Sequence, residues 1–181
     1  MGPKSPTRRF GARSPMWGRA DSFEALHRYV CRVGGRQLLE ALASGPLHRF
    51  ANFHDIAELP RTGAGVYAIW DDKARLVYVG IAGRNIVGKG LHGRLKSHYQ
   101  GRRSGDQFCV YVADRCVLIE LTKDEREAIG AGALSMDRKI RAYVRAHFAF
   151  RYIETDDYTT AMRVENAVKA GALGDRPLLN P

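Results

Sequence analysis

Six residues in the C-terminal two thirds of the chain have types and spacings that could do chemistry together. Two tyrosines each stand beside a glycine in short apolar runs, in the strings GVY at 65–67 and YVG at 78–80. An arginine and a histidine follow four residues apart, which places them on one face of a helix. Arginine can hold a phosphate through its planar fork, a carboxylate can hold Mg²⁺, and tyrosine or histidine can position or deprotonate water. The six are Tyr67, Tyr78, Arg94, His98, Glu165 and Asn180.

Each of these residues also has a purely structural interpretation. Tyrosine favours half-buried strands, so two tyrosines in apolar runs indicate little more than a sheet. The arginine and histidine suit a solvated helix face, the acid suits an ion pair with Lys169 four residues on, and the asparagine suits a turn. Only the joint order of the six along the chain favours chemistry.

This ordered set resembles the GIY-YIG endonuclease family, over residues 63–180. The resemblance implies metal-dependent cleavage of DNA and an α+β fold with a small, mainly antiparallel sheet flanked by helices. The matching strings are GVY (65–67), YVG (78–80), GLHGRLKSHY (90–99), MRVENAV (162–168) and PLLN (177–180).

The resemblance implies that the two tyrosines and the arginine act at the scissile phosphate. Tyr67 would be the general base or would position the water. It would need help from neighbouring cations or from the metal, because an unperturbed tyrosine has a pKa near 10. Tyr78 would orient water or phosphate beside it. Arg94 would donate in bidentate fashion to the non-bridging oxygens.

The resemblance implies supporting roles for the other three residues. His98 would hydrogen-bond the nucleophile, Tyr67 or the phosphate. Glu165 would hold one divalent metal, Mg²⁺ or Mn²⁺. Asn180 would orient Glu165 or the phosphate.

Three departures from the family pattern are visible. Many members carry a lysine three positions after the second motif tyrosine, where this chain has Ile81. The loop at 83–90 is longer than in compact members, and its Arg84 or Lys89 could supply the missing charge. The stretch 106–147 is an insertion. Two alternatives therefore stay open: a nucleic-acid-binding module that has lost catalysis, and a nuclease directed at RNA, which a basic groove does not distinguish from DNA.

The charge distribution points to a polyanion as partner. The chain has 29 Lys and Arg against 19 Asp and Glu, a net charge of +10. Residues 1–20 hold five basic residues and residues 73–105 hold eight, with no acid in either segment. Such a stripe on a near-neutral body is typical of nucleic-acid binding, although an excess of charge also serves solubility. Backbone contacts to double-stranded DNA are expected from Lys96, Arg102 and Arg103, at and after the basic helix.

Composition excludes several classes of protein. Three cysteines are too few for a disulfide scaffold and indicate a reducing compartment, and their spacing does not fit a zinc knuckle. No run approaches the roughly 20 apolar residues of a membrane span, and no secretory signal is evident. The expectation is a cytoplasmic protein. With one site per chain, cutting both strands would require a dimer or two successive nicks.

The helices and strands that position the six residues are predicted from hydrophobic periodicity and from residues that end helices and strands. Three segments are expected: a disordered basic arm (1–18), an N-terminal helical segment (19–60) and a nuclease-like domain (61–181). The glycine- and proline-rich arm lacks the apolar residues needed to order it. Strands are expected at 65–70, 76–82, 108–113, 116–121 and 148–155. Helices are expected from residue 22 to the Gly45-Pro46 stop, at 91–100, at 123–147 with a break near 130–132, and at 158–173.

Overall fold

The chain folds around one four-stranded antiparallel sheet with the order β1-β4-β2-β3. A computed structural model describes residues 35–83 and 90–180. The architecture is α+β with a mainly antiparallel sheet, which confirms the expected fold class. The strands are β1 (His48–Arg49), β2 (Ala64–Asp71), β3 (Leu76–Ala82) and β4 (Phe148–Thr155).

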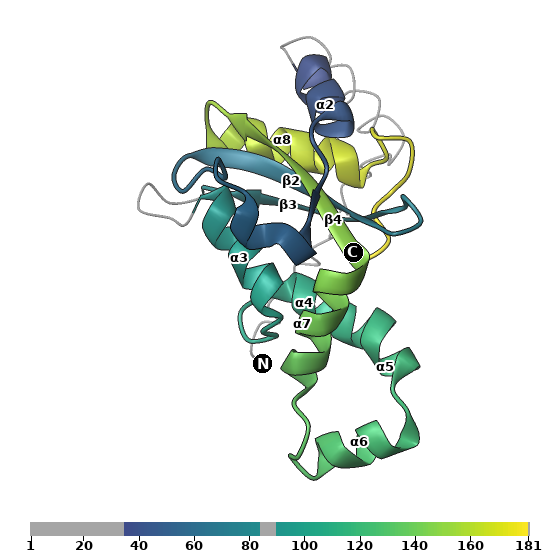
Figure 1. Ribbon diagram of the computed structural model, residues 1–181. Coiled ribbons are helices and arrows are strands. Elements are labelled where there is room, and N and C mark those ends of the chain that lie inside the picture. Colours follow the sequence, from purple (N-terminus) through teal and green to yellow (C-terminus); the bar gives the residue numbers. More distant parts are fainter. Residues whose placement is uncertain (1–34, 84–89, 181) are drawn as a thin grey trace, which may run out of the picture.

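Helices cover both faces of the sheet (Figure 1). Helices α2 (Gly35–Ser44) and α8 (Tyr158–Lys169) lie on one face. The other face is covered by the 3-10 helix η1 (Phe50–Asp55), α3 (Leu91–Gln100), α4 (Gln107–Val112) and α7 (Met136–His147). The π-helical turn η2 (Ala113–Val117), α5 (Leu118–Glu120) and α6 (Lys123–Gly130) lead away from the sheet before α7 returns to it.

Alternation along β2 divides the core into two clusters. Tyr67 and Ile69 point to the face covered by α3 and α7, whereas Val66 and Ala68 point to the face covered by α8. All four side chains are fully buried. Successive strand residues face opposite sides of a sheet, so a short apolar run in the middle of a covered sheet supplies both cores. The site tyrosine is therefore fixed on the α3 side.

A bulge in β3 breaks the alternation where the second tyrosine lies. Ile69 pairs with Tyr78, but the next residue, Trp70, pairs with Leu76. Val77 is thus the extra residue, and Val77 and Tyr78 both join the core on the α3 side. Bulges of this kind re-aim side chains. Tyr78 itself keeps the regular pairing and shares the face of Ile69 and Tyr67, and the bulge turns Val77 to that face as well.

The two motif glycines are required by close packing. Gly80 pairs with Tyr67 across the strands, and the Tyr67 ring lies directly over it. A Cβ at Gly80 would overlap the Tyr67 hydroxyl and come within 2.6 Å of its Cζ. A Cβ at Gly65 would come within 2.6 Å of the Ile153 carbonyl oxygen and 2.7 Å of Leu91 Cδ1. The absence of a side chain at Gly80 leaves room for the Tyr67 ring, and its absence at Gly65 lets α3 approach the sheet.

Gly80→Ala is expected to lower the free energy of unfolding by about 1–3 kcal/mol, the usual cost of overpacking a core. The added methyl group has only the buried Tyr67 ring and strand backbone to displace. Urea unfolding monitored by circular dichroism measures this. Gly130→Ala is the matched control, because nothing lies within 4 Å of a Cβ at that position in α6. A Gly80→Ala protein as stable as the control would contradict the packing of Tyr67 over Gly80.

The expectation of strands at 108–113 and 116–121 is wrong, because this region forms α4, η2 and α5. An apolar run rich in valine is ambiguous between a strand and a buried helix. Two features favour the helix. Asp106 caps it by accepting from the Cys109 amide at 3.4 Å, and Phe108, Val112 and Val117 are buried together with α7. The stretch 106–147, expected to be an insertion, consists of helices and loops.

Most other expected elements are confirmed. The hairpin, the helix at 91–100 and the strand at 148–155 are present, and the helical stretch 123–147 is broken between α6 and α7. The last helix ends at Lys169, four residues earlier than expected. The expected arm at 1–18 and the helix before residue 35 lie outside the described residues. None of the described helices has the length and apolar character to cross a membrane.

The C-terminal segment runs along the outer edge of β3. The amides of Leu178 and Leu179 donate to the carbonyl oxygens of Leu76 and Val77 at 3.1 and 2.8 Å. Asn180 then continues the pairing with its side chain. This segment holds the part of β3 that carries Tyr78.

Candidate active site

Three buried side chains form a hydrogen-bonded chain at the centre of the site. The Tyr67 hydroxyl lies 2.7 Å from His98 Nε2, and His98 Nδ1 lies 2.6 Å from Asp106 Oδ2. Tyr67 and His98 are 0% exposed and Asp106 is 3% exposed. The three come from β2, α3 and the cap of α4, so the packing of both helices against the sheet sets the geometry.

Burial, hydrogen bonds and the nearby Arg94 set the charges of His98 and Asp106. Burial lowers the pKa of His98, which keeps the imidazole neutral. Burial alone would raise the pKa of Asp106, but the hydrogen bond from His98 and the positive charge of Arg94 bring it below its usual value. An ionised Asp106 requires a proton on Nδ1, so Nε2 is the acceptor and the Tyr67 hydroxyl is the donor.

Arg94 and Tyr78 stand beside this chain. The Arg94 guanidinium interacts with the hydroxyls of both Tyr67 and Tyr78. Burial alone would lower the pKa of Arg94, but the oxygens around it raise the pKa, so it is charged. The Tyr67 and Tyr78 rings are stacked with centroids 6.4 Å apart. Burial raises the pKa of Tyr78 to about 12 and that of Tyr67 well above 10, so neither is a free tyrosinate at neutral pH.

Glu165 approaches the site from the opposite face of the sheet. It lies on α8 and its carboxylate acts electrostatically on the Tyr78 hydroxyl. The side chain is 14% exposed, and Oε1 lies 3.3 Å from Lys169 Nζ. One partly exposed carboxylate fits a Mg²⁺ or Mn²⁺ ion that takes its other ligands from water and phosphate. The ion pair with Lys169 would compete with such an ion.

A second group of possible ligands is buried inside the site. One ligand atom each from His98, Asp106 and Cys109 lies within 4.8 Å of the others, so the three could hold a metal ion. A nitrogen, oxygen and sulfur set suits a softer ion such as Zn²⁺ better than Mg²⁺. These ligand atoms already have hydrogen-bond partners. His98 Nδ1 is bonded to Asp106, and the Cys109 thiol donates to the backbone carbonyl oxygen of His98 at 3.8 Å.

The other expected contact residues lie outside the hydrogen-bonded chain of Tyr67, His98 and Asp106. The side-chain amide of Asn180 binds the backbone of Val79. Its Oδ1 accepts from the Val79 amide at 2.7 Å, and its Nδ2 donates to the Val79 carbonyl oxygen at 3.0 Å. Its amide is therefore bonded to β3, and a role in orienting Glu165 or a phosphate stays a prediction. Of the basic residues, Lys96 and Arg102 are exposed, and Arg103 is paired with Asp137 at 2.9 Å. Arg84 and Lys89 lie outside the described residues.

Sequence reasoning missed Asp106. The signal was present, because an aspartate directly before an apolar stretch is a common helix N-cap. The expectation of a strand at 108–113 leaves Asp106 without a role. His98 was assigned a partner among Tyr67, the nucleophile and the phosphate, and the structure places it on Tyr67.

No protein-family model matches the chain, and no curated protein or solved structure matches it either. The site therefore has to be interpreted from its own geometry.

Proposed function

We propose that the chain is a metal-dependent endonuclease that hydrolyses phosphodiester bonds in double-stranded DNA. The observation that carries the proposal is the hydrogen-bonded chain from Tyr67 through His98 to Asp106, with the Arg94 guanidinium beside the tyrosine. The ordered resemblance to the GIY-YIG family and the basic segment at 73–105 support it.

The chain of hydrogen bonds gives the tyrosine a route for its proton. Tyr67 is 0% exposed, so a water admitted together with the substrate would give its proton to the Tyr67 oxygen while the tyrosine's own proton passes to His98 Nε2. Asp106 holds the imidazole in the required tautomer and stabilises the imidazolium that forms, as the acid of a hydrolase triad does. The route makes a free tyrosinate unnecessary, which agrees with the raised pKa of Tyr67.

The remaining residues act on the phosphate. Arg94 offers N–H groups and positive charge to the non-bridging oxygens, and the tyrosine hydroxyls orient it. Tyr78, at 7% exposed, lies nearer to solvent than Tyr67 and can hold the phosphate or the water. Mg²⁺ or Mn²⁺, held by Glu165, would supply further positive charge at the developing oxyanion.

Nicking of supercoiled plasmid in Mg²⁺, with an EDTA control, tests the proposal. We expect metal-dependent nicking that falls by about 10²-fold in Glu165→Gln, the scale of losing one electrostatic contact to the transition state. Lys169→Gln is the matched control, because it breaks the same ion pair and leaves the carboxylate in place.

Nicking by Glu165→Gln at the wild-type rate would remove Glu165 from the site. Salt-sensitive DNA binding with no nicking of plasmid or large genomic DNA would favour a binding module that has lost catalysis. Faster cleavage of a matched RNA duplex would redirect the proposal to RNA.

The cleavage rate is expected to rise with pH below about 6.5 and then stay level to about pH 9. His98 must be neutral to accept the proton, and burial puts its pKa below 6.5. Protonation of His98 as the pH falls removes the acceptor. The tyrosines contribute no alkaline limb in this range, since the pKa of Tyr78 is about 12 and that of Tyr67 is raised well above 10. Single-turnover rates measure this, and a rise centred near pH 10 would show that tyrosinate is the base.

A further inference from the structure

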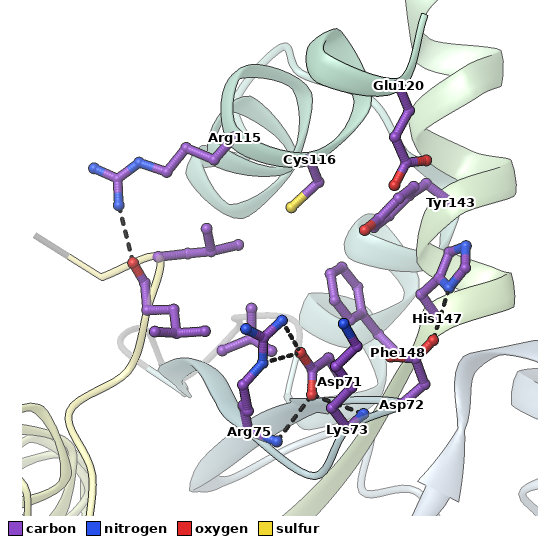
Figure 2. A pocket seen from close by; sticks show the side chains of 13 residues that line it. Asp71, Asp72, Lys73, Arg75, Arg115, Cys116, Glu120, Tyr143, His147 and Phe148 are labelled. Carbon is purple, nitrogen blue, oxygen red and sulfur yellow. Dashed lines mark hydrogen bonds and ion pairs between the residues drawn. The ribbon is translucent and has the colours of Figure 1, made fainter.

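A cavity lies at the far end of the β2–β3 hairpin, away from the paired Tyr67 and Gly80. Its volume is about 400 Å³, within the range of small-molecule sites. The hairpin turn at 71–75 forms one wall, and residues of η2, α5 and α7 form the other (Figure 2). None of the six residues singled out from the sequence lines it.

Most charges around this cavity are paired with one another. Arg75 binds Asp71 at 2.7 Å, and His147 Nδ1 lies 3.2 Å from Asp72. Lys73 is different: in the described part of the chain its amino group has no hydrogen-bond or ion-pair partner, and it points into the cavity in Figure 2. The Lys73 amino group is therefore available to a ligand.

The opposite wall offers groups that suit a nucleotide. The Tyr143 hydroxyl lies against the Cys116 thiol, and burial raises its pKa to about 12, so it remains a neutral donor. The Glu120 carboxylate has no ion-pair partner in the described residues and extends beside Tyr143. Val77 and Phe148 supply apolar surface. A phosphate suits Lys73, and the amino group of a base suits a carboxylate acceptor.

Buried side chains connect the wall of the cavity to the proposed active site. Val77, which lines it, directly precedes Tyr78 on β3. Phe108 contacts the ring of Tyr78 at 5.1 Å and that of Phe148 at 5.7 Å. From Tyr67 to Asp71, β2 advances about 13 Å at about 3.3 Å per residue. Phosphates of one strand follow each other every ~3.4 Å along a duplex, so this length corresponds to roughly four nucleotides.

We infer that this cavity binds a nucleotide of the DNA substrate, roughly four nucleotides from the phosphate held by Arg94. Lys73 binds its phosphate, and Glu120 and Tyr143 contact its base. The inference rests on the proposed nuclease function and adds to it a second contact that positions the strand and prefers certain bases.

Binding of a fluorescein-labelled 20-bp duplex in EDTA tests the contact between Lys73 and the phosphate, because binding can be measured without cleavage. Lys73→Gln is expected to weaken binding about 5-fold and to lower the slope of log K against log salt by about 0.9, the value for one phosphate contact. Lys123→Gln is the matched control, since this lysine is 80% exposed on α6 and outside the cavity. An equal effect of the two substitutions would overturn the inference.

Disulfide trapping then tests the location. Duplexes carrying one thiol-tethered base at successive positions are expected to crosslink to Cys116 most strongly near the fourth nucleotide from the cleaved bond. Cys116→Ser, which keeps the other two cysteines, should lose that crosslink. Uniform or absent crosslinking by a chain that nicks plasmid would overturn the subsite and leave the nuclease standing. A chain that neither nicks nor binds DNA would overturn both.

Discussion

Replacing Tyr67 by phenylalanine is expected to lower the single-turnover rate of plasmid nicking by about 10³-fold, within the usual range for loss of an acid–base group. The substitution removes only the hydroxyl that bonds His98 Nε2 at 2.7 Å. Phenylalanine still fills the space over Gly80, so the sheet keeps its packing. Binding of the uncut duplex should change by less than about 3-fold, because Tyr67 is 0% exposed.

Two checks keep this result interpretable. Tyr67→Phe leaves His98 Nε2 buried without a donor, which costs about 1–3 kcal/mol of stability, so folding is verified by thermal unfolding. Tyr99→Phe is the matched control, since Tyr99 is buried on α3 but outside the hydrogen-bonded chain. Nicking by Tyr67→Phe at the rate of this control would show that the Tyr67 hydroxyl takes no part in catalysis.

Replacing Asp106 by asparagine is expected to reduce nicking by about 10³- to 10⁴-fold, the scale seen when the acid of a hydrolase triad is neutralised. The asparagine amide can donate to Nδ1, which moves the proton of His98 to Nε2. Nε2 then donates to Tyr67 and can no longer accept its proton. Asparagine is as good an N-cap as aspartate, so α4 should persist.

The tautomer of His98 distinguishes the proposed role of Asp106 from a purely structural one, because a purely structural role would leave the tautomer unchanged when Asp106 is replaced. Nitrogen NMR of the imidazole should show Nδ1 protonated in the wild type and Nε2 protonated in Asp106→Asn. An unchanged tautomer together with lost activity would contradict the proposed proton route. Wild-type activity in Asp106→Asn would remove Asp106 from the mechanism.

Local patterns were enough to predict the parts of the site that lie in regular elements. The alternation of β2 and the helical spacing of α3 depend on neighbouring residues, and they place Tyr67 and His98 correctly. The bulge that turns Val77 to the same face as Tyr78 depends on pairing between β2 and β3, which periodicity does not contain.

The hydrogen-bond partners that sequence reasoning did not predict depend on contacts between distant segments. Asn180 binds Val79, 101 residues away in the chain, so its partner could not be inferred from its own surroundings. Asp106 meets His98 only because the stretch after it is helical. That helix is decided by burial against α7 and by a cap, which outweigh the strand propensity of its valines. The resemblance to a family indicated the residue types, and the tertiary packing determined their partners.

The pairing of the C-terminal segment with β3 also affects how the protein meets other chains. A bare outer strand is a template on which strands of other molecules can add, and this leads to aggregation. Here residues 178–180 occupy the hydrogen-bonding groups of Leu76, Val77 and Val79, and the strand at the opposite edge, β1, is only two residues long. At the β3 edge these residues leave little room for strand addition. Two copies that cooperate to cut both strands of a duplex would have to associate through a surface other than this edge.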